Sequence, residues 1–130
     1  SANYTINSTH LRRKMKIVNK PWGYEKWVEG EGCVLKEIFM KAGTRSSLQY
    51  HKEKDEVMLI QRGQGIMTVN NDKLPFKPDS SFHIGKGVIH RVEAITDLIL
   101  YEASTPQLDD VVRLSDDWNR GDGRIESEHK

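Results

Sequence analysis

The sequence predicts an all-β fold in a single domain. Its 130 residues fit one domain that is long enough to bury a hydrophobic core. From Tyr24 onward, short runs rich in β-branched and aromatic residues alternate with turn residues at intervals of about 8 to 12, as in sandwiches and barrels.

Turn residues separate the expected strands. Glycines and Asn or Asp residues stand at the joints, because they supply the backbone freedom or the local hydrogen bonds that tight turns need. Joints of this kind favour antiparallel hairpins. In order along the chain, the expected strands are 24–29, 33–40, 46–51, 56–61, 65–70, 80–84, 89–94 and 98–103.

The ends of the chain differ in composition from the middle. Residues 1–18 are polar and weakly patterned, and we expect an N-terminal extension there. Residues 19–105 carry the barrel. Residues 106–130 are acidic and then mixed, and they predict a C-terminal tail packed on the barrel, with at most a short helical turn near 116–119.

The charge balance and the apolar runs limit the possible partners. Lys plus Arg number 20 against 19 Asp plus Glu, so neither nucleic acid nor a membrane surface is expected as a partner. The longest apolar stretches, such as 57–60, fall far short of the ~20 residues that a spanning helix needs. The first residues lack the apolar segment of a secretory leader, and the single Cys33 cannot form an internal disulfide. We therefore expect a cytoplasmic protein.

One short stretch carries a candidate metal site. Residues 43–63 read GTRSSLQYHKEKDEVMLIQRG. On a strand, Gln49 and His51 project to the same face, and the KEKD turn returns Glu56 beside them on the next strand. His90 follows the glycine-rich turn at Gly87 and would be the fourth donor. Two imidazoles, a carboxylate and an amide oxygen suit a first-row divalent ion with open positions for water or substrate.

The spacing of these residues resembles the cupin signature. Gly43, Gln49, His51, Glu56 and Gly63 match the first cupin motif, with glutamine in place of the first histidine. The second motif is matched by Gly85, Gly87 and His90, although Gly85 replaces its usual proline. The resemblance implies a double-stranded β-helix, or jelly-roll, barrel.

A glutamine at that position is the pattern of cupin-type mannose-6-phosphate isomerases. The segments NKPWGYEKWVE, SLQYH and LDDVVRLSDDWNR resemble that family, so the likeness extends over roughly residues 19–120. It implies one divalent metal ion per chain (Zn, Mn, Fe, Co or Ni), a sugar or sugar phosphate as the ligand, a role in activated-sugar or polysaccharide synthesis, and a homodimer. The implied metal ligands are Gln49, His51, Glu56 and His90.

The ligand set suits an aldose–ketose isomerase. A proton must move between adjacent carbons, and a metal beside the oxygens stabilises the negative charge that develops. Arg45 and Lys54 are the candidate phosphate-binding residues, whereas strand parity places Arg91 on the face opposite His90. The sequence identifies no catalytic base.

Two alternatives remain open. Two histidines and a carboxylate also describe the facial triad of non-haem iron oxygenases, although Gln49 argues against that reading. A non-catalytic sugar-binding module is the other alternative, because many activities share this barrel.

Overall fold

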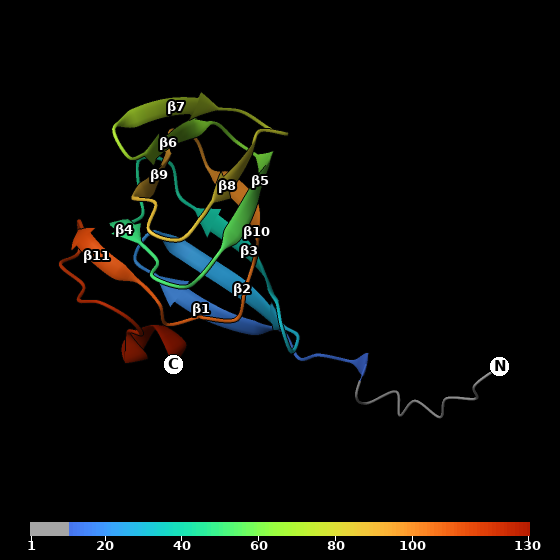
Figure 1. The fold of residues 1–130 in the computed structure, drawn as a ribbon. Coiled ribbons are helices and arrows are strands. Elements are labelled where there is room, and N and C mark those ends of the chain that lie inside the picture. The colour runs from blue at the N-terminus through green and yellow to red at the C-terminus, as the bar shows by residue number, and fades with distance from the viewer. Residues whose placement is uncertain (1–10) are drawn as a thin grey trace.

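The computed structural model describes residues 11–130, which form two antiparallel sheets (Figure 1). The six-stranded sheet has the order β1 (Lys16–Lys20), β2 (Gly23–Glu29), β3 (Val34–Met40), β10 (Leu98–Ser104), β5 (Glu56–Arg62) and β8 (Ser81–Ile84). The five-stranded sheet has the order β11 (Val112–Ser115), β4 (Leu48–Tyr50), β9 (His90–Ala94), β6 (Gly65–Val69) and β7 (Asp72–Phe76). The predicted all-β class is confirmed.

Three strands were not predicted from the sequence. β1 begins at Lys16, inside the stretch assigned to an N-terminal extension, and residues 1–10 of that stretch lie outside the described residues. β7 contains Pro75, which lacks a backbone donor, and it is tolerated because β7 is an edge strand. β11 lies within the expected tail, and its pairing with β4 joins residues that are far apart in the sequence.

The hydrophobic core lies between the two sheets. The alternation expected of strands is clear on β5, where Met58 and Ile60 are buried while Val57 and Leu59 are exposed. The core cluster comprises Trp22, Ile38, Met40, Met58, Ile60, Met67, Phe76, Ile84, Val92, Ala94, Leu98 and Leu100.

Two glycines of the first motif have left-handed backbone conformations. Gly43 has φ +82° and Gly63 has φ +93°. A side chain at Gly63 would collide with the backbone carbonyl of Asp97, whereas the space around Gly43 is open. Gly63 is therefore required by both its conformation and its neighbour.

The segment after β10 covers one end of the barrel. β11 extends the five-stranded sheet, and the 3₁₀ helix η1 (Glu126–His129) lies beside β1, as Figure 1 shows. Lys20 on β1 donates to Glu128 at 2.7 Å. At 116–119 there is a turn, closed by Asn119 N–H and the Asp116 carbonyl at 3.1 Å. No helix within residues 11–130 is long and apolar enough to span a membrane.

Candidate metal centre

Three of the predicted metal ligands meet at one point inside the barrel. Glu56 is the first residue of β5, His90 is the first residue of β9, and His51 directly follows β4. Glu56 Oε1 lies 3.1 Å from His51 Nε2 and 3.2 Å from His90 Nε2. All three side chains are buried, with about 1% of each exposed. Glu56 thus returns to His51 as expected, but the expected hairpin is wrong, because β4 and β5 belong to different sheets and the turn crosses from one to the other.

The outer nitrogens of both histidines fix how the rings face the site. His51 Nδ1 lies 2.6 Å from the Asp110 carbonyl, and His90 Nδ1 lies 2.9 Å from the Val88 carbonyl. A carbonyl oxygen only accepts, so both Nδ1 atoms donate, and each Nε2 faces Glu56, with a lone pair if the ring is neutral and with an N–H group if it is protonated.

Two lone pairs and a carboxylate oxygen that converge in this way need positive charge between them. Protons on the Nε2 atoms or a metal ion would supply it. The ligand atoms of the three residues all lie within 4.8 Å of one another. A donor set of two oriented imidazoles and one carboxylate therefore fits a divalent transition metal.

Gln49 lies beside the other three predicted ligands. It pairs with His90 across β4 and β9, and its Nε2 lies 3.5 Å from His90 Nε2. Its amide oxygen accepts a hydrogen bond from Ser47 Oγ at 2.6 Å. Rotation of the amide would exchange the two ends, after which the oxygen would face the site and the nitrogen would donate to Ser47.

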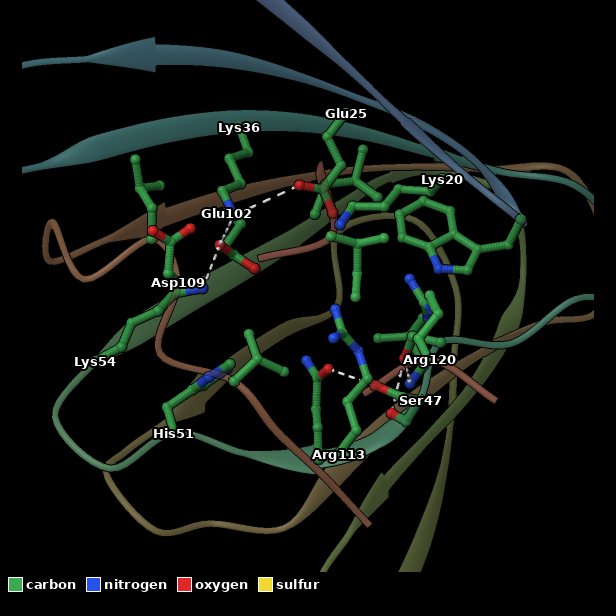
Figure 2. A pocket seen from close by; sticks show the side chains of 18 of the residues that line it. Lys20, Glu25, Lys36, Ser47, His51, Lys54, Glu102, Asp109, Arg113 and Arg120 are labelled. Carbon is green, nitrogen blue, oxygen red and sulfur yellow. Dashed lines mark hydrogen bonds and ion pairs between the residues drawn. The ribbon is translucent and has the colours of Figure 1, made fainter. Parts of the chain in front are cut away.

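A chain of buried charges leads away from Glu56 along the six-stranded sheet. Lys54 Nζ lies 3.2 Å from both Glu56 Oε2 and Glu102 Oε2. Lys36 Nζ continues the chain at 3.7 Å from Glu102 and 3.5 Å from Glu25 (Figure 2). Three buried carboxylates thus share two buried lysines, and the cluster carries one excess negative charge when every group is ionised.

The surroundings shift the pKa values of these groups in opposite directions. Burial, followed by the negative charge of Glu56, raises the pKa of Glu102 to about 7. Burial also opposes ionisation of Glu56, but hydrogen bonds with His51 and His90 and the charge of Lys54 hold its pKa well below the usual range. Burial would lower the pKa of Lys54, yet the surrounding carboxylates raise it. Lys54 therefore stays charged, and Glu102 is the carboxyl that retains a proton most easily.

The two predicted phosphate-binding residues lie in different places. Lys54 lines the pocket, although its ammonium group already contacts two carboxylates. Arg45 is not among the pocket residues, and its guanidinium makes a two-pronged contact with Asp117 at 2.8 Å on the surface. The sequence-based role of Arg45 in binding phosphate thus finds no support in its position.

The pocket is lined by both sheets and by the C-terminal segment. Its inner space is about 80 Å³, enough for several water molecules. Figure 2 shows Glu25, Lys36, Glu102 and Lys54 along one wall, with His51 below them. The C-terminal segment contributes Leu108, Asp109, Val111, Arg113, Arg120, Gly123, Arg124, Ile125 and His129 to the lining.

Arg113 on β11 is a pocket residue that the sequence analysis did not single out. Its side chain reaches into the pocket in Figure 2. Nη1 donates to the carbonyls of Gly121 and Gly123, and the buried Nε has no hydrogen-bond partner. Among the described cations that line the pocket, Arg113 is the one without a carboxylate ion pair. Its positive charge is therefore available to an anion.

Asp110 lies in the acidic stretch that the sequence analysis assigned to a tail packed on the barrel. Its carboxylate accepts hydrogen bonds from the backbone N–H groups of Lys52, Glu53 and Lys54 at 3.0, 2.6 and 2.9 Å. Its own carbonyl orients His51. Asp110 thus fastens the C-terminal segment to the turn that joins two metal ligands.

Comparison with known proteins finds relatives that match most of this chain. The chain is 30% identical over 117 residues to the mannose-1-phosphate guanylyltransferase of Escherichia coli K12, covering 85% of this chain and 24% of that protein. It is also 30% identical over 109 residues to the xanthan biosynthesis protein XanB of Xanthomonas campestris pv. campestris B100, covering 79% of this chain and 23% of that protein. The chain spans about a quarter of the length of these relatives.

Solved structures with the same fold have more distant sequences. An RmlC-like cupin from Shewanella frigidimarina aligns with a TM-score of 0.65 at 15% identity, over 82% of this chain and 92% of that one. The salicylate 1,2-dioxygenase of Pseudaminobacter salicylatoxidans aligns with a TM-score of 0.54 at 18% identity, over 56% of this chain and 21% of that one. These likenesses support the cupin fold alone.

The family comparison covers most of the chain. Residues 7–116 match the family described as mannose-6-phosphate isomerase C-terminal. The protein therefore belongs to the mannose-6-phosphate isomerase C-terminal family, and its fold is a cupin barrel.

Proposed function

We propose that this chain is a metal-dependent isomerase that interconverts the aldose and ketose forms of a sugar phosphate, with mannose 6-phosphate as the first candidate. The observation that carries the proposal is a pocket in which a His–Glu–His cluster adjoins buried ionisable groups. Such a protein would serve the supply of activated sugars for polysaccharide synthesis.

The proposed metal ligands are His51, Glu56 and His90, with Gln49 as the fourth. A divalent ion held there would supply positive charge beside the sugar oxygens, where negative charge develops during proton transfer. The backbone carbonyls behind the two histidines keep the rings in a binding orientation before any ion arrives.

Glu102 is our candidate for moving the proton between the two sugar carbons. It lines the pocket directly beside Glu56, and Lys54 Nζ holds the two carboxylates next to each other. Its Oε2 contacts Lys54 Nζ at 3.2 Å, and burial raises its pKa to about 7, so the carboxyl can gain and lose a proton near neutral pH. Glu102→Gln should therefore lower kcat strongly while metal content is unchanged.

Arg113 is our candidate for binding the phosphate. A guanidinium without a carboxylate partner suits a doubly charged anion, since no ion pair has to be broken first. We expect Arg113→Gln to raise KM for a sugar phosphate at least tenfold, equivalent to about 1.4 kcal/mol. Arg45→Gln is the matched control, because Arg45 carries the same charge outside the pocket, and it should leave KM unchanged.

The deciding experiment is an NMR assay of mannose 6-phosphate and fructose 6-phosphate after elemental analysis has identified the metal. Interconversion that stops on chelation, returns with the metal and is absent from His90→Ala would support the proposal. Metal at one ion per chain without interconversion would overturn it in favour of another ligand or a binding role.

The same three ligands also favour a second candidate, a non-haem iron oxygenase. Two histidines and one carboxylate with open positions are the usual set for that chemistry. Oxygen consumption by the iron-loaded protein with an organic substrate would identify it. Sugar-phosphate binding without turnover would instead indicate a non-catalytic sugar-binding module.

A further inference from the structure

Two buried tryptophans line the pocket, and their indole N–H groups differ in bonding. Trp22 lies in the turn between β1 and β2, Trp27 lies on β2, and each residue has 4% of its surface exposed. Trp27 Nε1 donates to Glu25 Oε1 at 2.7 Å. Trp22 Nε1 is buried and has no hydrogen-bond partner among residues 11–130. Because nearly all buried polar side-chain atoms are bonded, the N–H group of Trp22 requires an explanation.

Packing accounts for the rings of Trp22 but not for its N–H group. The side chain belongs to the apolar core cluster, and five other members of that cluster also line the pocket. They are Ile38, Met40, Met58, Val92 and Leu100. An apolar side chain would fill the core equally well, whereas a buried donor without an acceptor costs free energy. An acceptor atom on a ligand in the pocket would remove that cost.

The apolar surroundings of Trp22 favour a neutral oxygen over an anionic one as the acceptor. A phosphate group buried beside apolar residues would lose its hydration at a far higher cost in free energy than a hydroxyl group. Lys20, the pocket cation nearest to Trp22 in the sequence, is already paired with Glu128 at 2.7 Å. Arg113 therefore remains the candidate for the phosphate, and Trp22 suits an uncharged part of the ligand.

We propose that Trp22 Nε1–H donates a hydrogen bond to a neutral oxygen, a hydroxyl or a carbonyl, of a sugar phosphate bound in the pocket. The inference rests on the proposed function for the class of ligand, and it adds a residue that recognises the sugar itself. A single neutral donor in a fixed position selects where a ligand oxygen lies, and it contributes nothing to the attraction of charge. Trp22 would thus act on specificity, whereas Arg113 acts on the phosphate.

The test is a ¹⁵N–¹H NMR spectrum of the zinc-loaded full chain, titrated with mannose 6-phosphate and separately with inorganic phosphate. The chain has three tryptophans and hence three indole signals, which the single replacements by Phe assign. Mannose 6-phosphate should move the Trp22 proton downfield, because it gains a hydrogen bond, and inorganic phosphate should leave it in place. Two internal controls should move little: Trp27, which is already bonded, and Trp118, which is 39% exposed and is not among the pocket residues.

Calorimetric titration with mannose 6-phosphate separates this inference from the proposed function. Trp22→Phe should raise Kd about three- to tenfold, as expected for one neutral hydrogen bond, while Trp118→Phe leaves Kd unchanged. Binding without a shift of the Trp22 signal would overturn this inference alone, because the partner of Nε1 would then be a buried water molecule. A shift with inorganic phosphate would also overturn it, by assigning Trp22 to the anion. If mannose 6-phosphate does not bind, both this inference and the proposed function are wrong.

Discussion

Replacing Asp110 tests whether the C-terminal segment holds the metal site together. Asp110→Ala removes the acceptor of three backbone hydrogen bonds of 2.6 to 3.0 Å. Lys52 and Glu53 are exposed, so their freed N–H groups regain water, whereas the bond of Lys54 is part-buried; we take less than 1 kcal/mol for each bond and about 2 kcal/mol in total. A chain of this length loses roughly 4 °C in Tm per kcal/mol, which predicts a Tm lower by about 8 °C.

The effect of Asp110→Ala should depend on pH and should reach the metal. Backbone hydrogen bonds outweigh burial and lower the pKa of Asp110 below its usual 3.8. Its stabilisation is therefore complete above that value and is lost as the pH falls through the pKa of the folded state. Because the Asp110 carbonyl orients His51, a loosened segment should also weaken metal binding about tenfold or more.

The assay is thermal unfolding followed by circular dichroism, with metal-free protein at neutral and at low pH, and calorimetric titration with zinc. Asp109→Ala is the control, since it removes the neighbouring carboxylate, for which the structure records no side-chain hydrogen bond. If both variants unfold at the same temperature and bind zinc equally, the clamping role assigned to Asp110 is wrong.

Three further predictions concern stability. In the metal-free protein, the pKa of about 7 at Glu102, against the usual 4.5, means that the folded state holds a proton that the unfolded state releases. The free energy of unfolding should fall by roughly 3 kcal/mol between pH 4.5 and 7, and Glu102→Gln should abolish that fall in urea titrations. Lys36→Met should destabilise by roughly 3 kcal/mol in the same titrations, because it leaves the buried Glu25 without its closest cation; a neutral effect would refute that pairing. Gly63→Ala should cost several times more stability than Gly43→Ala, which carries only the conformational cost of about 1 kcal/mol; equal losses would exclude a role for the Asp97 carbonyl.

The sequence predicted those parts of the site that depend on local geometry. Gln49 and His51 share a face because strands alternate with a period of two, and a turn of four residues is enough to return Glu56 to them. The structure brings His90 to the same point from β9. The relations among Gln49, His51 and Glu56 follow from spacing, whereas His90 reaches the site through the pairing of β9 with β4.

The parts that could not be predicted depend on contacts between distant residues. Arg45 was expected to bind phosphate, but its guanidinium forms an ion pair with Asp117, which is 72 positions away in the chain. Lys54 lies in the charged turn KEKD, and such turns are usually exposed to solvent. Its burial depends on its ion pair with Glu102 from β10. The sequence around Arg113, VVRLS, has the alternation of a strand, but these residues were assigned to the tail.

The bond between His51 and the Asp110 carbonyl has a consequence for the order of folding. The two residues are 59 positions apart, and strands β5 to β10 lie between them in the sequence. Contacts between such distant segments form slowly, since the intervening loop must first be closed. We therefore expect the His51 imidazole to reach its ligating orientation late in folding. Tight metal binding would then indicate that the C-terminal segment has docked on the barrel. Rapid-mixing experiments with a coloured metal ion such as cobalt would then time the last step of folding.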